Sequence, residues 1–142
     1  MLEQVDGFTP VDEAHILLAG VRDLNEREKE LLQDSRIRLA QYDQIQRNGV
    51  EQTISPLLES MRKVVDRVYF HIDLDVLDPT VAPTNHFMAP GGLDIDDVLL
   101  IIRAIKERFR IAAAAIAAYA PRFDEKGVTA HAALRFAKEL VA

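Results

Sequence analysis

Short apolar runs suited to buried strands alternate along this chain with segments whose apolar residues recur at helical spacing. Alternation of this kind predicts an α/β fold, a mostly parallel sheet of about four strands with helices on both faces. The candidate strands are residues 14–21, 37–41, 67–73 and 111–121, and the candidate helices are residues 26–35, 51–65, 98–105 and 128–141.

The alanine-rich run at 111–121 can be interpreted in two ways. Alanine is the best helix former, so propensity by itself favours a helix. The run follows one helix and ends at Pro121, however, and small side chains on a buried strand allow helices to approach closely. We therefore expect a strand, with a helix as the alternative.

Composition excludes several classes of protein. The net charge is −6 and no basic tract occurs, which argues against nucleic-acid binding. No apolar stretch reaches the roughly 18 residues that a membrane span needs. The chain has no cysteine and its start does not resemble a signal peptide, so we expect a single domain of 142 residues in the cytoplasm.

Three carboxylates, Asp73, Asp75 and Asp78, follow the candidate strand 67–73. Functional groups in α/β sheets gather at the carboxyl ends of the strands. Strand alternation would turn His71, Asp73 and Asp75 to one side, where a hard divalent cation would offset the repulsion between the two aspartates. The alternative is that Asp75 and Asp78 only cap turns at the start of a loop.

A wider set of motifs resembles the ureohydrolase superfamily of arginase, agmatinase and formimidoylglutamase. The motifs are "HIDLDVLDPTVAP" followed by "PGGL", "LLAGVRDLNEREKELL" upstream, and "AYAPRFDEKGVTAHAALRFAKEL" downstream. The resemblance implies the three-layer αβα arginase-like fold. It also implies that residues 1–142 are the carboxyl-terminal half of such a domain.

The resemblance implies a function as well: hydrolysis of C–N bonds in small guanidino or amidino compounds by a hydroxide held between two manganese ions. Asp73 would bridge both ions and Asp75 would bind one, and Asp78 would shape the loop. His71 would orient a ligand or a water, or would be an ordinary packed histidine.

The chain departs from the family in its metal ligands. The "GGDHS"-like and "DAHxD" segments that supply the remaining ligands are absent. We therefore expect this chain to bind manganese weakly or not at all and to be inactive alone. The alternative is a non-catalytic structural or assembly module whose carboxylates are only loop caps. Half of a sheet would also leave a bare strand edge, which invites pairing, so we expect a homo-oligomer.

A second departure concerns the substrate. Ala118, in "AYAP", stands where arginases have a glutamate that pairs with guanidinium, and "TNHFM" at 84–88 replaces a "GTGTP"-like loop. His86 and Phe87 would line a different pocket or pack on the core. A divergent amidine or amide hydrolase is therefore favoured over an arginase or agmatinase.

Overall fold

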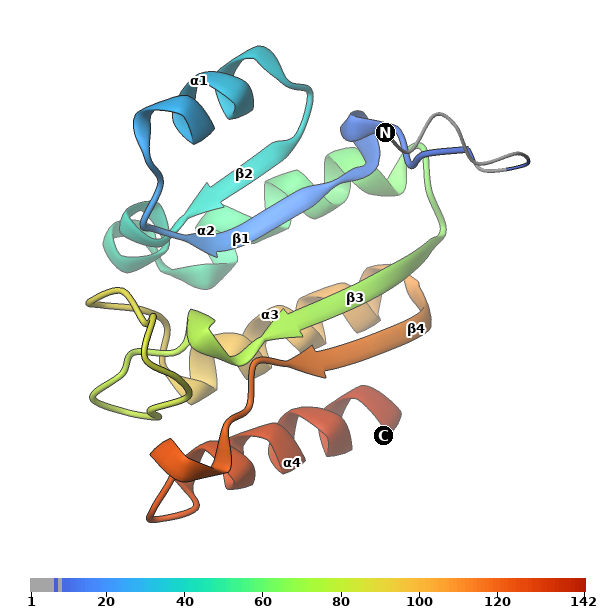
Figure 1. Cartoon of the computed structure of the whole chain (residues 1–142). Coiled ribbons are helices and arrows are strands. Elements are labelled where there is room, and N and C mark those ends of the chain that lie inside the picture. The colour runs from blue at the N-terminus through green and yellow to red at the C-terminus, as the bar shows by residue number, and fades with distance from the viewer. Residues whose placement is uncertain (1–6, 8) are drawn as a thin grey trace.

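Strands and helices alternate throughout the chain in the computed structural model, which describes residue 7 and residues 9–142 (Figure 1). The predicted alternation is confirmed, and the alanine-rich run is a strand. The elements are β1 (Leu17–Val21), α1 (Glu26–Asp34), β2 (Arg38–Gln41), α2 (Tyr42–Arg62), β3 (Arg67–Asp73), α3 (Ile95–Arg108), β4 (Arg110–Ala117) and α4 (Val128–Val141).

The four strands form two separate parallel pairs, β1 with β2 and β3 with β4. All four point the same way, so their carboxyl ends share one side of the molecule (Figure 1). Helices α2 and α3 lie behind the strands, whereas α1 and α4 lie beside the outer strands β2 and β4. The predicted α/β fold with parallel strands is confirmed, but the four strands form two pairs and not the single sheet of about four strands that was expected.

The core lies between the strands and helices α2 and α3. Ile54 and Leu58 of α2, Ile72 of β3 and Ile102 of α3 are buried there, and Phe136 brings α4 into the same cluster. Burying each of these side chains contributes about 1.5–3 kcal/mol. The opposite face of β3 is open, since Tyr69 keeps 64% of its surface exposed.

Local capping follows the sequence closely. Asn25 accepts a hydrogen bond from the Glu28 amide (3.0 Å), and Glu28 accepts one from the Asn25 amide (2.9 Å), which starts α1. Asp94 caps α3 by accepting a hydrogen bond from the Asp97 amide at 2.7 Å. Such caps typically contribute about 1 kcal/mol each.

Several predicted boundaries are wrong; the strand expected at 111–121, for example, ends at Ala117. Residues Glu13–His15 form a short 3₁₀ turn, capped by Asp12, so β1 starts only at Leu17. Helix α2 starts at Tyr42, well before residue 51, where the Gln41 amide donates to Gln44 Oε1 at 3.0 Å. Helix α2 has a kink at Gly49, whose φ of 80° is not helical.

No helix in the described part of the chain is both long and apolar enough to cross a membrane.

The "PGGL" segment brings the chain back against the turn that follows β3. The Leu93 amide donates to Val76 O (2.9 Å), and the Asp78 amide donates to Leu93 O (3.0 Å). Gly92 makes this approach possible, because a Cβ there would lie 2.6 Å from the main chain of Leu77 and Asp78. Gly92 also has a φ of 133°, which L side chains rarely adopt.

We predict that Gly92→Ala destabilises the fold by about 3 kcal/mol or more, since main-chain atoms cannot move aside as a flexible side chain would. Gly127→Ala is the matched control: its backbone is left-handed helical, with φ of 68° and ψ of 17°, and no atom lies within 4 Å of the added Cβ, so the loss should be only about 1 kcal/mol. Urea unfolding of both variants measures the difference. Equal losses would contradict this role of Gly92.

Candidate metal and substrate site

Asp73 and Asp75 come together at the carboxyl end of β3. Asp73 is the last residue of the strand, and its Oδ1 accepts a hydrogen bond from the Asp75 amide at 3.2 Å. This bond opens a 3₁₀ turn, Leu74–Val76, whose Leu74 side chain is fully buried. The expectation that strand alternation extends to Asp75 is wrong, because the chain leaves the strand at Asp73. The turn still keeps both aspartates at the same end of β3.

The two carboxylates repel each other. Burial, the charge of Asp73 and a hydrogen bond with Asp73 raise the pKa of Asp75, and Asn85 and Arg22 oppose the shift only in part. Ionised Asp75 therefore carries an electrostatic penalty in the folded chain. A bound cation would remove this penalty, because a nearby positive charge favours the ionised carboxylate.

Arg22, just after β1, holds the main chain of the turn in place. Its guanidinium donates to Asp75 O at 2.6 Å and to Ala89 O at 3.2 Å, with a longer bond to Val76 O at 3.4 Å. Sequence reasoning missed this residue. Its one signal was its place in the "GVRD" stretch, directly behind an apolar run.

Asp78 shapes the next loop, as expected. Its Oδ1 accepts from the amide of Thr80 (2.7 Å) and from the Thr80 hydroxyl (2.6 Å). These bonds lower the pKa of Asp78. The side chain of Asp78 thus forms an Asx turn.

His71 lies on the open face of β3, with its Nδ1 at 3.3 Å from the Tyr69 hydroxyl. Its part in orienting a ligand or water stays a prediction.

Ala118 follows β4, one residue beyond the register partner of Asp73, Ala117. Its φ of 63° is unusual for a residue with a side chain, and such backbone costs about 1–2 kcal/mol. A methyl group is all that this position offers to a substrate. Strained positions of this kind concentrate at functional sites.

Asp124, in the "DEKG" stretch, is a second residue that sequence reasoning missed. It is buried and accepts hydrogen bonds from the amides of Thr129 (3.0 Å) and Ala130 (2.8 Å) at the start of α4, and from the Tyr119 hydroxyl (3.2 Å). Burial acts to raise the pKa of Asp124, but the amides of Ala130 and Thr129 outweigh it and lower the pKa. Asp124 therefore joins the segment after β4 to α4 and is not free to bind a substrate.

The loop that replaces "GTGTP" packs on the segment after β4. The rings of His86 and Phe123 meet edge to face with centroids 4.3 Å apart, whereas Phe87 is 90% exposed. Beside Phe123 lies an open groove of about 520 Å³, which Pro83 and Arg122 also line. Of the two loop residues, His86 is thus a packing residue.

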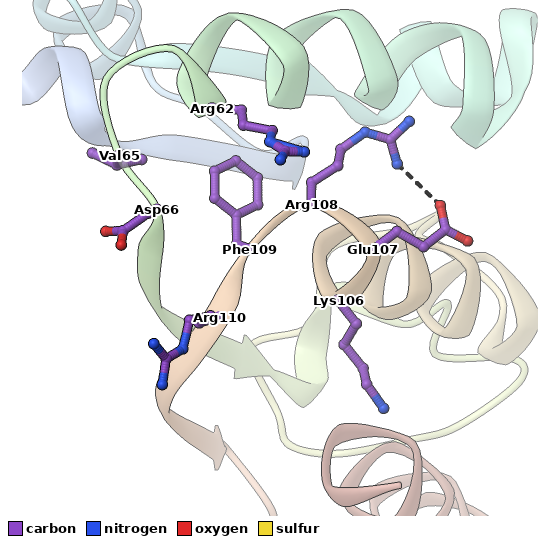
Figure 2. Close-up of a pocket in the computed structure, with 8 residues that line it drawn as sticks. All are labelled: Arg62, Val65, Asp66, Lys106, Glu107, Arg108, Phe109 and Arg110. Atoms are coloured by element: carbon purple, nitrogen blue, oxygen red, sulfur yellow. Dashed lines mark hydrogen bonds and ion pairs between the residues drawn. The ribbon is translucent and has the colours of Figure 1, made fainter.

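Another hollow, of about 430 Å³, lies at the opposite end of β3 and β4. Figure 2 shows Phe109 at its centre, with Arg62, Asp66 and Arg110 around it. The length of β3, seven residues, separates it from Asp73 by about 20 Å. It contains none of the residues expected in the site.

The donor set at Asp73 and Asp75 fits a hard cation only in part. Carboxylate oxygens suit manganese or magnesium. Within the described residues, however, no group of three or more potential metal-ligating side chains occurs. The structure thus offers two carboxylates, not a complete coordination shell.

Comparisons with known proteins agree with this arrangement. A sequence profile described as "Arginase family" matches residues 5–142. An arginase from Bacillus caldovelox is 29% identical over 134 residues, which are 94% of this chain and 45% of that protein. Its crystal structure superposes with a TM-score of 0.89 at 28% identity, covering 98% of this chain and 47% of that one.

A more distant structure, a proclavaminate amidino hydrolase from Streptomyces clavuligerus, has a TM-score of 0.74 at 26% identity over 92% of this chain and 42% of its own. This chain therefore spans less than half the length of each of these relatives.

We predict that Asp75→Asn stabilises the chain at pH 7, because a raised pKa in the folded state means that ionisation of Asp75 weakens folding. The gain should be below about 1 kcal/mol, since water screens a partly exposed pair. It should vanish below about pH 4, where the unfolded carboxyl is also protonated. Thermal unfolding from pH 3 to 8 measures it.

Asp78→Asn is the matched control with the opposite sign. Its pKa is lowered, so its charge stabilises the fold above the unfolded pKa and this stabilisation is lost as pH falls. The control should be less stable than the parent at pH 7. The same sign for both variants would refute the assignment of repulsion to Asp73 and Asp75.

Proposed function

This chain belongs to the arginase family, and we propose that it forms the carboxyl-terminal half of a metal-dependent hydrolase. The reaction class is cleavage of C–N bonds in small guanidino, amidino or related compounds. The observation that carries the proposal is the pair Asp73 and Asp75 at the carboxyl end of β3, in which burial and the charge of Asp73 raise the pKa of Asp75.

In this proposal Asp73 and Asp75 hold two manganese ions together with ligands from outside this chain. Bound manganese supplies a nucleophile near neutral pH and neutralises developing negative charge. The other residues position the metal ligands and the loop beside them. Arg22 fixes the main chain of the turn that carries Asp75, and Asp78 fixes the following loop. His71, one step back along β3, orients a ligand or a water.

The substrate differs from arginine in this proposal. Ala118 offers no carboxylate to a guanidinium, so a charge-assisted, bidentate pair is lost there. The buried Asp124 does not replace it, because its oxygens already accept from α4 and Tyr119. An amidino or amide compound, which does not need a carboxylate partner, suits this end of β4 better than a guanidino compound does. Among the relatives, a formimidoylglutamase from Bacillus subtilis is 25% identical over 125 residues.

A second candidate function is a non-catalytic module of arginase-like fold. The observation that favours it is that the described residues bring no third metal ligand to Asp73 and Asp75. The manganese titration described below distinguishes the hydrolase from the non-catalytic module in part. The hydrolase activity of the co-expressed complex distinguishes them fully.

Two further proposals concern the setting of the protein. The bare strand edges favour a homo-oligomer. A sequence without cysteine suits the reducing cytoplasm.

We predict that the 142-residue chain binds Mn²⁺ with a Kd on the order of millimolar, because two carboxylates leave most of the shell to water. Asp73→Asn should weaken binding further. Asp66→Asn, an exposed aspartate at the other end of β3, should leave it unchanged. Calorimetric titration measures all three. Micromolar affinity that Asp73→Asn abolishes would mean that the site is complete and the chain is not ligand-deficient.

The function itself is tested by activity. Alone, the chain should hydrolyse neither arginine nor agmatine. Co-expressed with the part of the Bacillus caldovelox arginase that it does not match, it should release urea or ammonia from members of a guanidino and amidino panel, only with manganese and not after Asp73→Asn. A complex that forms but shows no manganese-dependent hydrolysis of any member would favour the non-catalytic module.

A further inference from the structure

The loop between β3 and α3 reaches the candidate metal ligand Asp75 through one side chain, Asn85. Burial and the charge of Asp73 raise the pKa of Asp75, and a hydrogen bond with the Asn85 side chain acts against them. A bond that favours the ionised carboxylate is one in which the amide donates. Asn85 Nδ2 also donates to Thr84 Oγ1 at 3.2 Å, and Asn85 Oδ1 accepts from the Phe87 amide at 2.7 Å. One carboxamide therefore connects Asp75 with the main chain of Phe87.

These bonds determine how far Phe87 lies from the aspartate pair. Two hydrogen bonds of about 3 Å each and the width of one carboxamide place the Phe87 amide within about 8 Å of the Asp75 carboxylate. Figure 1 shows this loop at the carboxyl end of β3, the end that carries Asp73. A small molecule held at the two aspartates is thus within reach of the Phe87 side chain.

Phe87 is exposed although the loop around it is anchored. Thr84 is fully buried, and the His86 ring packs on the ring of Phe123 with centroids 4.3 Å apart. The Thr84 amide closes the loop by donating to Met88 Sδ at 3.1 Å. Phe87 nevertheless keeps 90% of its surface exposed. A ring exposed to this degree gains little from folding and is available to a ligand.

The neighbouring position after β4 has no acidic partner for a cation. Ala118 follows Ala117, the register partner of Asp73, and offers only a methyl group. A planar cation is held in proteins either by a carboxylate or by the face of an aromatic ring within about 6 Å of the ring centroid. Phe87 supplies such a ring near Asp75, whereas Ala118 supplies no charge.

We propose that the Phe87 ring recognises the planar cationic group of the substrate, an amidinium, and that Asn85 is the residue that positions this ring. The inference rests on the proposed function, because it concerns the substrate of that site. It narrows the substrate class, since the electron-rich ring face attracts a protonated amidine but not a neutral amide of the same shape.

The test uses the metal-free 142-residue chain and two small probes of the same shape, acetamidine and acetamide. In two-dimensional NMR spectra, the amide shifts of residues 84–88 give the Kd. A nuclear Overhauser contact between the Phe87 ring and the methyl group of the probe gives its location. We expect acetamidine to bind with a Kd on the order of tens of millimolar and to show this contact. Acetamide should bind at least about tenfold more weakly.

Substitutions of Phe87 separate the ring from the charge of the aspartates. Phe87→Leu keeps an apolar side chain without a π face and should bind acetamidine about threefold more weakly. Phe87→Trp should bind at least as tightly as the parent, because indole is the best ring for a cation. The fluorescence of this variant measures the contact, since the chain has no other tryptophan. Asp73 and Asp75 are the same in every variant, so their direct attraction for the probe cancels in the comparison.

Asn85→Ala tests the positioning role. This variant should lose the nuclear Overhauser contact with the Phe87 ring and bind acetamidine as weakly as Phe87→Leu. Asn48→Ala is the matched control, since Asn48 is an exposed asparagine in α2, and it should bind as the parent does. Circular dichroism checks the fold of each variant.

Four results would overturn the inference. They are equal binding of acetamidine by the parent and Phe87→Leu, equal binding of acetamidine and acetamide, a bound probe without contact to the Phe87 ring, and an Asn85→Ala variant that keeps that contact. Self-association that Phe87→Leu abolishes, with no effect on acetamidine binding, would assign Phe87 to a protein interface instead.

The absence of manganese keeps this test distinct from the test of the proposed function. A ring contact with acetamidine, in a chain whose co-expressed complex shows no hydrolase activity, would remove only the proposed function. Manganese-dependent hydrolysis by a complex whose chain fails the acetamidine test would remove only the role of Phe87 and Asn85.

Discussion

The hydrogen bonds from the Arg22 guanidinium to the main chain after β3 connect the two halves of this structure. β1 and β3 share no sheet hydrogen bonds, so Arg22 and the packing of α2 on α3 set how the strand pairs sit together. The same bonds fix the turn that carries Asp75. A charged donor that binds main-chain carbonyls is among the stronger hydrogen bonds of a protein. The geometry of the candidate site therefore depends on Arg22 together with the packing of α2 on α3.

The carboxyl end of β3 concentrates negative charge where the fold supplies little to offset it. Asp78 is satisfied by Thr80, and Asp124 by the start of α4. Asp73 and Asp75 remain, and burial together with their mutual repulsion raises the pKa of Asp75. Sites that tolerate such repulsion are often functional, because a ligand of opposite charge relieves it. This contrast separates the two candidate metal ligands from the aspartates that only shape loops.

Within the described residues, neither the sheet nor the metal-binding group has its usual complement of partners. A parallel sheet is normally buried on both faces and paired along its interior strands, but here two pairs stand side by side unjoined. The donor pair at Asp73 and Asp75 is likewise short of ligands.

The sequence by itself determined the features that depend on neighbours within a few residues. These include the alternation of strands and helices, the Asn25 and Asp94 caps, the Asx turn at Asp78 and the place of Asp73 at a strand end. Only the tertiary structure decided the rest. Arg22 acts on carbonyls more than fifty residues away, Gly92 matters because of the main chain of Leu77, and Asp124 is buried by contacts with α4. Local propensity and spacing carry no information about such long-range contacts, because packing alone brings the partners together.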